Sequence, residues 1–259
     1  MALRGALRIV EHDAMVYRRT WRGGIVTTIL GPFLFLASMG LGLGGYVDRG
    51  GSAAVLGGVS YLAFLAPGLL AAQAMQTAAF ESTYPILGRI QWDKTYLAAL
   101  ATPIGVDDLV WGELGWIAVR LTFACGIFLI VMAGFGAVHS PLAVLDLPVA
   151  VLTGLAFAAP IVAFSATQRR DSGFNAIFRF GVTPLFLFSG TFFPVDRLPE
   201  PLQPVAWITP LYHGVDLARA LSLGRVDPLP AGVHLVVLVA FAAGGVALAR
   251  AAFRRRLRV

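Results

Sequence analysis

Two opposite charges, Glu113 and Arg120, interrupt a stretch from Leu109 to Leu145 that is otherwise free of Asp, Glu, Lys and Arg. A spacing of seven residues places both side chains on one face of a helix, two turns apart. Ionisable groups within an apolar helix are costly, so they normally pair or serve a function. We expect a structural ion pair that holds helices together, with Arg120 bound to Glu113 or to Glu81. Lining of a polar path is the alternative.

A second polar group consists of Gln73, Gln76 and Thr77, which lie within the long apolar run 50–80. Spacings of three and four residues from Gln73 place all three on one helical stripe. Polar side chains in such a run normally face another helix or a cavity. Two interpretations stay open: hydrogen bonds between helices, or the lining of a route for an amphipathic molecule.

The residue types that catalysis needs are scattered. Lys94 is the sole lysine and no glycine-rich loop precedes it, so the sequence has no phosphate-binding loop for ATP. Cys125 is the only cysteine, which excludes an internal disulfide. No metal-ligand spacing relates the four histidines His12, His139, His213 and His234. We expect no catalytic residue, no metal and no cofactor on this chain.

Apolar elements must position these residues. Hydrophobic residues form 58% of the 259 residues and charged residues 13%, and the mean hydropathy is +0.77, unlike a soluble globular domain. A helix needs about 20 apolar residues to cross a hydrocarbon core of about 30 Å. Six runs reach or approach that length: 23–47, 50–80, 121–145 (continued back to about 109), 147–168, 180–195 and 229–249. We predict an all-α integral membrane protein with six transmembrane helices in a single domain, 1–259.

Basic residues gather on one side of the six predicted spans. The N-terminus, the segments 81–108 and 168–179, and the C-terminus share that side and hold most of the arginines. Because positively charged loops stay in the cytoplasm, we predict that both termini are cytoplasmic. Since the net charge of +6 comes from residues that flank spans, we expect membrane lipid and not nucleic acid as their counterpart.

Three segments outside the spans have patterns of their own. Within 1–22, apolar residues at alternating spacings of four and three oppose arginines, which predicts an amphipathic helix in the membrane interface. The segment 81–108 carries charges and a helical middle, and the segment 195–230 is rich in proline. Long loops in a compact membrane protein are usually functional.

Several of these segments carry motifs. The strongest is Phe188-Ser-Gly-Thr-Phe-Phe-Pro194 followed by Thr209-Pro210 and His213; others are Ala66-Pro-Gly-Leu69, Phe80-Glu-Ser-Thr-Tyr84 and Leu100-Ala-Thr-Pro103. In these motifs the chain resembles the permeases of type-2 ABC exporters, in particular the branch of the nodulation-factor (lipo-oligosaccharide) and daunorubicin-type drug exporters. The resemblance covers essentially the whole chain. One departure is the absence of the Glu-Arg-Glu-x-Gly-Thr run of many broader members.

This resemblance implies partners. Two permease copies, expected as a homodimer, would pair with two copies of an ABC ATPase that binds ATP and Mg, in a bacterial inner membrane. The segment from about Tyr84 to Ala101 is similar to the coupling helix that docks on the ATPase, with Arg89, Asp93 and Lys94 as exposed contacts. The residues assigned to ATPase coupling are Glu81, Tyr84, Arg89, Trp92, Asp93, Lys94, Thr102 and Pro103.

The resemblance also implies an outer gate, formed by short re-entrant helices between the fifth and sixth spans. The residues assigned to this gate are Gly190, Pro194, Pro199, Pro210 and His213. We expect Phe188, Phe192 and Phe193 to line the substrate path together with Gln73, Gln76 and Thr77. The alternative for these aromatic residues is contact with lipid or core packing.

The sequence thus predicts a non-catalytic permease subunit that uses a separate ATPase to export an amphipathic molecule, either a drug or antibiotic or a lipid-linked oligosaccharide. Two rivals stay open. An ion- or proton-coupled secondary transporter should show several midplane carboxylates or broken helices. An intramembrane enzyme needs a clustered nucleophile and base. The sequence shows neither clearly.

Overall fold

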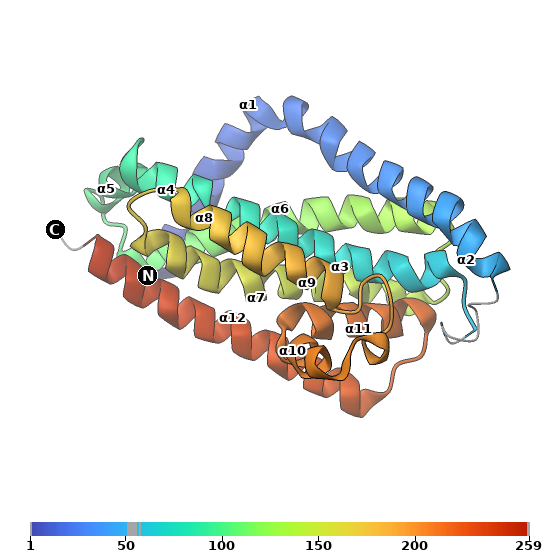
Figure 1. Cartoon of the computed structure of the whole chain (residues 1–259). Coiled ribbons are helices and arrows are strands. Elements are labelled where there is room, and N and C mark those ends of the chain that lie inside the picture. Colours follow the sequence, from blue (N-terminus) through green and yellow to red (C-terminus); the bar gives the residue numbers. More distant parts are fainter. Residues whose placement is uncertain (1, 51–55, 57, 258–259) are drawn as a thin grey trace.

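A computed structural model describes residues 2–50, 56 and 58–257. These residues form helices and connecting turns and contain no β-strand, which confirms the predicted all-α class. Four long helices lie side by side as a bundle (Figure 1): α3 (Tyr61–Glu81), α6 (Val106–Gly134), α7 (Asp146–Thr167) and α12 (Pro228–Arg256). A fifth long helix, α1 (Ala2–Leu36), arches along the outside of this bundle.

The two ends of the bundle differ. Both chain termini lie at one end, together with α4 (Tyr84–Gln91) and α5 (Thr95–Leu100), and we name it the terminal end (Figure 1). The opposite end, the distal end, carries α2 (Gly45–Arg49), α10 (Gln203–Ile208) and α11 (Pro210–Leu223). A chain whose two termini share one end runs along the bundle an even number of times.

Five helices in the described ranges are long and apolar enough to cross a membrane, by length and composition: Thr28–Arg49, Tyr61–Gln91, Val106–Gly134, Pro141–Thr167 and Pro228–Arg256. The predicted fifth span, 180–195, falls on a shorter composite helix. It consists of α8 (Ser172–Ala176), a π-helical stretch (Ile177–Val182) and α9 (Thr183–Phe188). At about 1.5 Å per residue it reaches roughly 25 Å, short of the hydrocarbon core of about 30 Å. Its crossing of the membrane stays a prediction.

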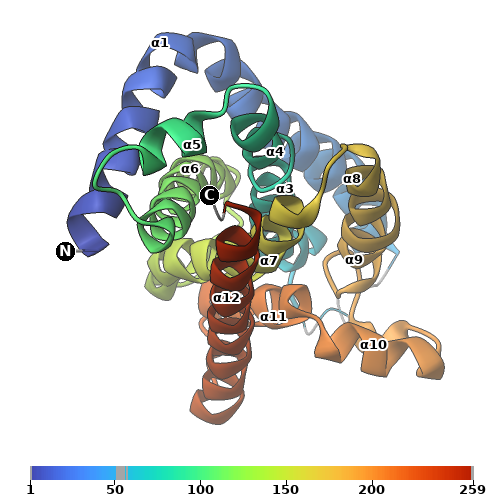
Figure 2. The same ribbon diagram turned by 90° about the vertical axis from the view of Figure 1, so that its left-hand side faces the viewer.

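The central helix is α3, which contacts α6, α7 and α11. It begins at Tyr61 because the side chain of Ser60 accepts a hydrogen bond from the backbone N–H of Ala63, which satisfies one free donor of the first turn. Small residues then allow neighbouring helices to approach closely, and Ala66 and Ala71 have no exposed surface. Seen along the bundle in Figure 2, α8 and α9 lie on one side of α3 and α7, and α6 on the other.

The predicted interfacial helix is not a separate element. One unbroken helix runs from Ala2 to Leu36, continues as a π-helix (Ala37–Gly44) and ends in α2. The part long and apolar enough to cross a membrane begins at Thr28, so the interfacial position of 1–22 stays a prediction. Gly23 and Gly24 lower helix propensity there but do not stop the helix. The first part of α1 packs on α6, where a Cβ added to Gly112 would lie 2.6 Å from the side chain of Ile9.

The third predicted span is also shorter than expected. Its apolar run continues to residue 145, but α6 ends at Gly134. Gly136 then adopts a positive φ of +72°, and Ser140 caps a short 3₁₀ helix (Pro141–Leu145) that leads into α7. Hydropathy does not register these helix-stopping residues.

The proline-rich segment folds as short helices at the distal end. Two 3₁₀ turns (Val195–Arg197 and Glu200–Leu202) lead into α10 and α11. The helix α11 packs against α3, α7 and α12, and its contact with α7 requires a glycine, because a Cβ on Gly214 would lie 2.3 Å from Thr153 Oγ1. The depth of these helices in a bilayer stays a prediction.

Candidate functional site

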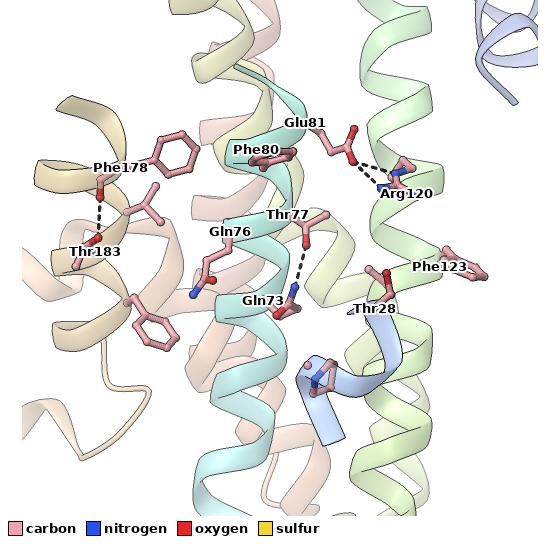
Figure 3. A pocket seen from close by; sticks show the side chains of 15 residues that line it. Thr28, Gln73, Gln76, Thr77, Phe80, Glu81, Arg120, Phe123, Phe178 and Thr183 are labelled. Atoms are coloured by element: carbon pink, nitrogen blue, oxygen red, sulfur yellow. Dashed lines mark hydrogen bonds and ion pairs between the residues drawn. The ribbon is translucent and has the colours of Figure 1, made fainter. Parts of the chain in front are cut away.

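A cavity of about 550 Å³ lies between α1, α3, α6 and the composite helix that ends in α9. One wall is the polar stripe of α3, with Gln73, Gln76 and Thr77, and Phe178 points towards α3 from the composite helix (Figure 3). The aromatic residues of the lining are Phe80, Phe123, Phe178 and Phe186. A cavity with amide and hydroxyl groups on one side and aromatic rings around them suits an amphipathic molecule.

An ion pair crosses this cavity wall (Figure 3). Arg120 on α6 donates to Glu81 Oε1 at the end of α3, from Nε at 2.9 Å and from Nη2 at 2.8 Å. The same guanidinium lies 4.4 Å from the centre of the Tyr17 ring on α1, a cation–π contact. Arg120 therefore joins three helices, and its partner is Glu81 and not Glu113.

The polar stripe points into the cavity. Gln73 Nε2 donates to Thr77 Oγ1 at 3.1 Å, which is a bond within α3 and not between helices. Gln76 points towards the helix that carries Phe178 and Thr183 (Figure 3). Of the two interpretations from the sequence, lining of a cavity is the one that this geometry favours.

A second cavity of about 300 Å³ adjoins the first along α3. The two share Gly31, Pro32, Gln73, Gln76 and Phe186 in their linings. Leu69 also lines the second cavity, and it lies two turns before Gln76, closer to the distal end. The side of α3 that faces α1 and α9 thus borders a continuous track over about half of the helix length.

The three aromatic residues expected on the path do not line these two cavities. Phe192 packs edge-on against Phe186 with ring centres 5.0 Å apart, Phe193 packs on a small core that contains Val195, and Phe188 is exposed at the end of α9. The helix ends at Phe188 and the following residues turn back across the distal end, so a place for these aromatic residues on the substrate path stays a prediction.

A cluster of buried charges lies at the terminal end. Arg89 Nη1 on α4 donates to Asp13 Oδ2 on α1 at 2.7 Å and also pairs with Glu113 Oε1 on α6. The side chains of Asp13 and Glu113 are 4% and 3% exposed, and that of Arg89 is 21% exposed. The expectation that Arg89 is an exposed contact is therefore wrong, since two carboxylates from other helices hold it inside. Burial raises the pKa of the nearby Tyr96 hydroxyl, which α5 contributes.

The other residues assigned to ATPase coupling fall into two groups. Glu81 and Tyr84 point inward, where Tyr84 packs edge-on against Phe174 with ring centres 5.2 Å apart. The exposed residues are Trp92, Asp93, Lys94, Thr102 and Pro103. The turn between α4 and α5 is fixed by Lys94, whose φ of 51° lies in the left-handed region. Trp92 and Leu97 are both large apolar side chains exposed near this turn, and the role of this surface in ATPase coupling stays a prediction.

The predicted gate residues lie at the distal end, where Arg219 ties Gly190 to α3. Arg219 donates to the carbonyl oxygens of Gly190 at 2.8 Å and Phe64 at 3.1 Å, and it lies 3.8 Å from the centre of the Phe64 ring. Gly190 turns the chain with a φ of +83°. The other assigned residues differ in exposure: Pro210 and His213 are buried, Pro194 is partly buried and Pro199 is exposed.

A family model for the ABC-2 type transporter matches residues 7–223, which include both cavities, the charge cluster and α11. The chain belongs to the ABC-2 type transporter family. It is therefore a multi-pass membrane protein and an ABC transporter permease, and the family implies an ABC ATPase as partner.

Relatives of this ABC-2 type transporter include nodulation proteins. The chain is 36% identical to nodulation protein J of Rhizobium leguminosarum bv. viciae, over 93% of each chain. It is 35% identical to nodulation protein J of Rhizobium meliloti (strain 1021), over 93% of this chain and 92% of the relative. The protein of the same name from Azorhizobium caulinodans is 27% identical over 85% of this chain and 86% of the relative.

Proposed function

We propose that the chain is the membrane-spanning subunit of an ATP-driven exporter that moves an amphipathic molecule out of the cytoplasm or the inner leaflet of a bacterial inner membrane. ATP and Mg bind to a separate ATPase, since the sequence has no phosphate-binding loop. The observation that carries this proposal is the cavity of about 550 Å³ in which the polar stripe of α3 and the Glu81–Arg120 pair face aromatic rings. Two copies of the chain and two ATPase copies form the transporter.

In this proposal the terminal end faces the cytoplasm. Most of the arginines flank the spans on that side, as expected for cytoplasmic loops. The turn between α4 and α5 then presents Trp92 and Leu97, both exposed large apolar side chains, to the ATPase. Asp93 and Lys94 beside them are exposed and available for charged contacts.

The charge cluster gives the ATPase a route to the cavity. Arg89 fixes α4 to α1 through Asp13 and to α6 through Glu113. Because α1 and α6 both form walls of the cavity, a rigid shift of α4 changes the distance between those walls. Rigid-body shifts of packed helices are a common form of conformational change.

The cavity chemistry favours a substrate with a polar head and an apolar tail. Carboxamides bind hydroxyl and amide groups, and aromatic rings accept acyl chains or flat apolar groups. Between a drug and a lipid-linked oligosaccharide, we favour the second, because several relatives are nodulation proteins. A cavity of 300 to 1,000 Å³ is about the size of a drug-sized ligand, so only part of a larger lipid would occupy it at one time.

Reconstitution tests this proposal directly. The chain and the ATPase that co-purifies with it are placed in liposomes, and transport of a fluorescent lipid-linked oligosaccharide and of a fluorescent drug is measured with ATP, with ADP, and with an imposed ion gradient. We expect ATP-dependent transport that Gln73→Leu reduces several-fold without loss of ATPase binding. Ile130→Leu, at an exposed position of α6 outside both cavities, is the control. Transport driven by an ion gradient without ATP would overturn the proposal in favour of a secondary transporter.

A further inference from the structure

An apolar groove of about 330 Å³ runs between α6, α7 and α12, and it shares no lining residue with either cavity along α3. Its lining contains no charged side chain. All three helices are long and apolar enough to cross a membrane, and Trp111 and Val239 in the lining are 47% and 52% exposed. The groove therefore opens to the hydrocarbon of the membrane and not to the inside of the bundle.

The groove leads to a cluster of charges at the terminal end. On α12, Val239 and Val246 line the groove two turns apart, and Arg250 follows one turn later on the same face. On α6, Asp107 precedes the lining residue Trp111 by one turn. From Val239 to Arg250 the helix rises about 16 Å at 1.5 Å per residue, which is about half of a hydrocarbon core of about 30 Å. The groove and the cluster together span one leaflet.

Two arginines share one acid in this cluster. Nε and Nη2 of Arg250 donate to the two oxygens of Asp107 at 2.9 Å and 2.8 Å, and Nη2 of Arg254 donates to the same carboxylate at 2.6 Å. The neighbouring Asp108 does not join them, since it accepts from the backbone N–H of Gly105. Arg250 and Arg254 are 41% and 55% exposed, so their other N–H groups are open to a ligand. One positive charge is left over beside the end of the groove.

We propose that the groove and its two arginines bind one anionic phospholipid, with an acyl chain along the groove and the phosphate on Arg254. A guanidinium group binds phosphate through paired N–H donors, and Arg250 lies beside Arg254 to share the contact. Basic sites between membrane helices on the cytoplasmic side are typical for anionic headgroups. Only the statement that the lipid belongs to the inner leaflet rests on the proposed function.

A second copy of this chain fits the groove less well. Two copies in one membrane keep the same orientation, so a symmetric contact through this face places the two charge clusters at the same depth. Like charges that meet at an interface repel each other, and two identical concave surfaces leave a gap where they meet. A lipid brings both complementary parts, a negative phosphate and a flexible apolar chain.

Native mass spectrometry of the full chain in detergent tests the preference for an anionic headgroup. The chain is titrated with phosphatidylglycerol, which is anionic, and with phosphatidylcholine of the same acyl chains, which is zwitterionic. We expect the affinity for phosphatidylglycerol to be higher by about fivefold or more, the effect of one arginine near an anionic lipid. Equal affinities for the two lipids would overturn the proposal.

Two arginine variants separate this site from general attraction to the basic C-terminal helix end. Arg254→Gln removes the surplus charge and leaves the pair of Arg250 and Asp107 in place, so it should abolish the preference for phosphatidylglycerol. Arg255→Gln is the matched control, because it removes an equal charge from the next position, on another face of α12. Equal losses in the two variants would overturn the proposal.

Two alanine variants test the groove itself. Ala243→Phe fills the groove and should weaken the binding of both lipids. Ala251→Phe is its control, since Ala251 is an exposed alanine of the same helix that does not line the groove, and it should bind both lipids like wild type. Unchanged lipid binding in Ala243→Phe, together with loss of a dimer seen in wild type, would overturn the proposal in favour of a contact between copies.

Contact quenching locates the acyl chain of the bound lipid. Bromine on an acyl chain quenches a tryptophan that it touches, and the difference between wild type and Trp111→Phe isolates Trp111 among the five tryptophans. We expect brominated phosphatidylglycerol to quench Trp111 more strongly than brominated phosphatidylcholine at the same mole fraction, and we expect Arg254→Gln to remove this difference. Quenching of Trp111 that does not depend on the headgroup would overturn the proposal. Neither measurement involves ATP or transport, so its failure is distinct from a failure of the proposed function.

Discussion

Removal of the Arg89 side chain leaves two buried carboxylates without their ion-pair partner. The loss in the free energy of unfolding can be worked out from this geometry. In Arg89→Gln, Asp13 and Glu113 keep their burial but lose the one guanidinium that both contact. Breaking a buried ion pair by removal of one partner costs about 3–5 kcal/mol. Protonation of a carboxylate limits this loss. To neutralise a carboxyl group with an ordinary pKa near 4 costs about 4 kcal/mol at pH 7, at 1.36 kcal/mol per pH unit. We expect a loss of about 3–4 kcal/mol in the free energy of unfolding at pH 7.

Because protonation limits the loss, the effect of Arg89→Gln on the free energy of unfolding should depend on pH. At pH 5 the same protonation costs only about 1.4 kcal/mol, so the difference between Arg89→Gln and wild type should shrink on acidification. The assay is reversible unfolding in mixed detergent micelles at both pH values. Lys94→Gln is the matched control, since it removes an exposed cation from the same loop and should change the free energy of unfolding by less than about 0.5 kcal/mol. Glu113→Gln added to Arg89→Gln removes one stranded charge and should recover part of the loss.

The same variants separate docking on the ATPase from transmission to the cavity. We expect Lys94→Glu to weaken co-purification with the ATPase, because its side chain is exposed on the turn between α4 and α5. Arg89→Lys keeps the charge and should retain both binding and transport in part, whereas Arg89→Gln should bind the ATPase and hydrolyse ATP with much less transport.

The unfolding experiment can refute the reasoning about the buried cluster. It would do so if Arg89→Gln lowered the free energy of unfolding by less than about 1 kcal/mol, or by the same amount at pH 5 and pH 7.

Two further predictions concern the cavity wall and the packing of α11. We expect Arg120→Gln to reduce transport more than Glu81→Gln does, because Arg120 contacts the substrate in the proposed function. ATP-driven uptake into inverted vesicles measures the difference. Equal losses in the two variants would show that the ion pair only links the helices. Gly214→Ala should destabilise the protein by about 1–3 kcal/mol, because the added Cβ would meet Thr153 Oγ1 at 2.3 Å. Gly232→Ala on α12 is its control, since its added Cβ meets nothing within 4 Å, and unfolding in mixed micelles should show it unchanged or slightly more stable.

Local patterns in the sequence predicted the elements but not their long-range pairing. The apolar runs located the long helices because a helix in lipid needs consecutive apolar residues along its whole length. The bond between Arg120 and Glu81 was one of two predicted options, since both residues lie near the same end of neighbouring helices. Asp13 was missed as the partner of Arg89, because these residues are 76 positions apart and no local spacing connects them. The end of α6 at Gly134 was missed because hydropathy averages over Gly136 and Ser140, which stop the helix.

The contacts of α1 connect α4 to the cavity. Asp13 and Tyr17 lie four residues apart, so they occupy one face of α1 on successive turns. Asp13 holds Arg89 of α4, and Tyr17 holds Arg120, whose other partner is Glu81 in the cavity wall. The helix α6 repeats this arrangement, because Glu113 and Arg120 lie two turns apart on one face. In the proposed function, a displacement of α4 by the ATPase would reach the ion pair of the cavity through two parallel helices. Such transmission needs acids that hold Arg89 firmly, and Asp13 and Glu113 meet this need because both are buried.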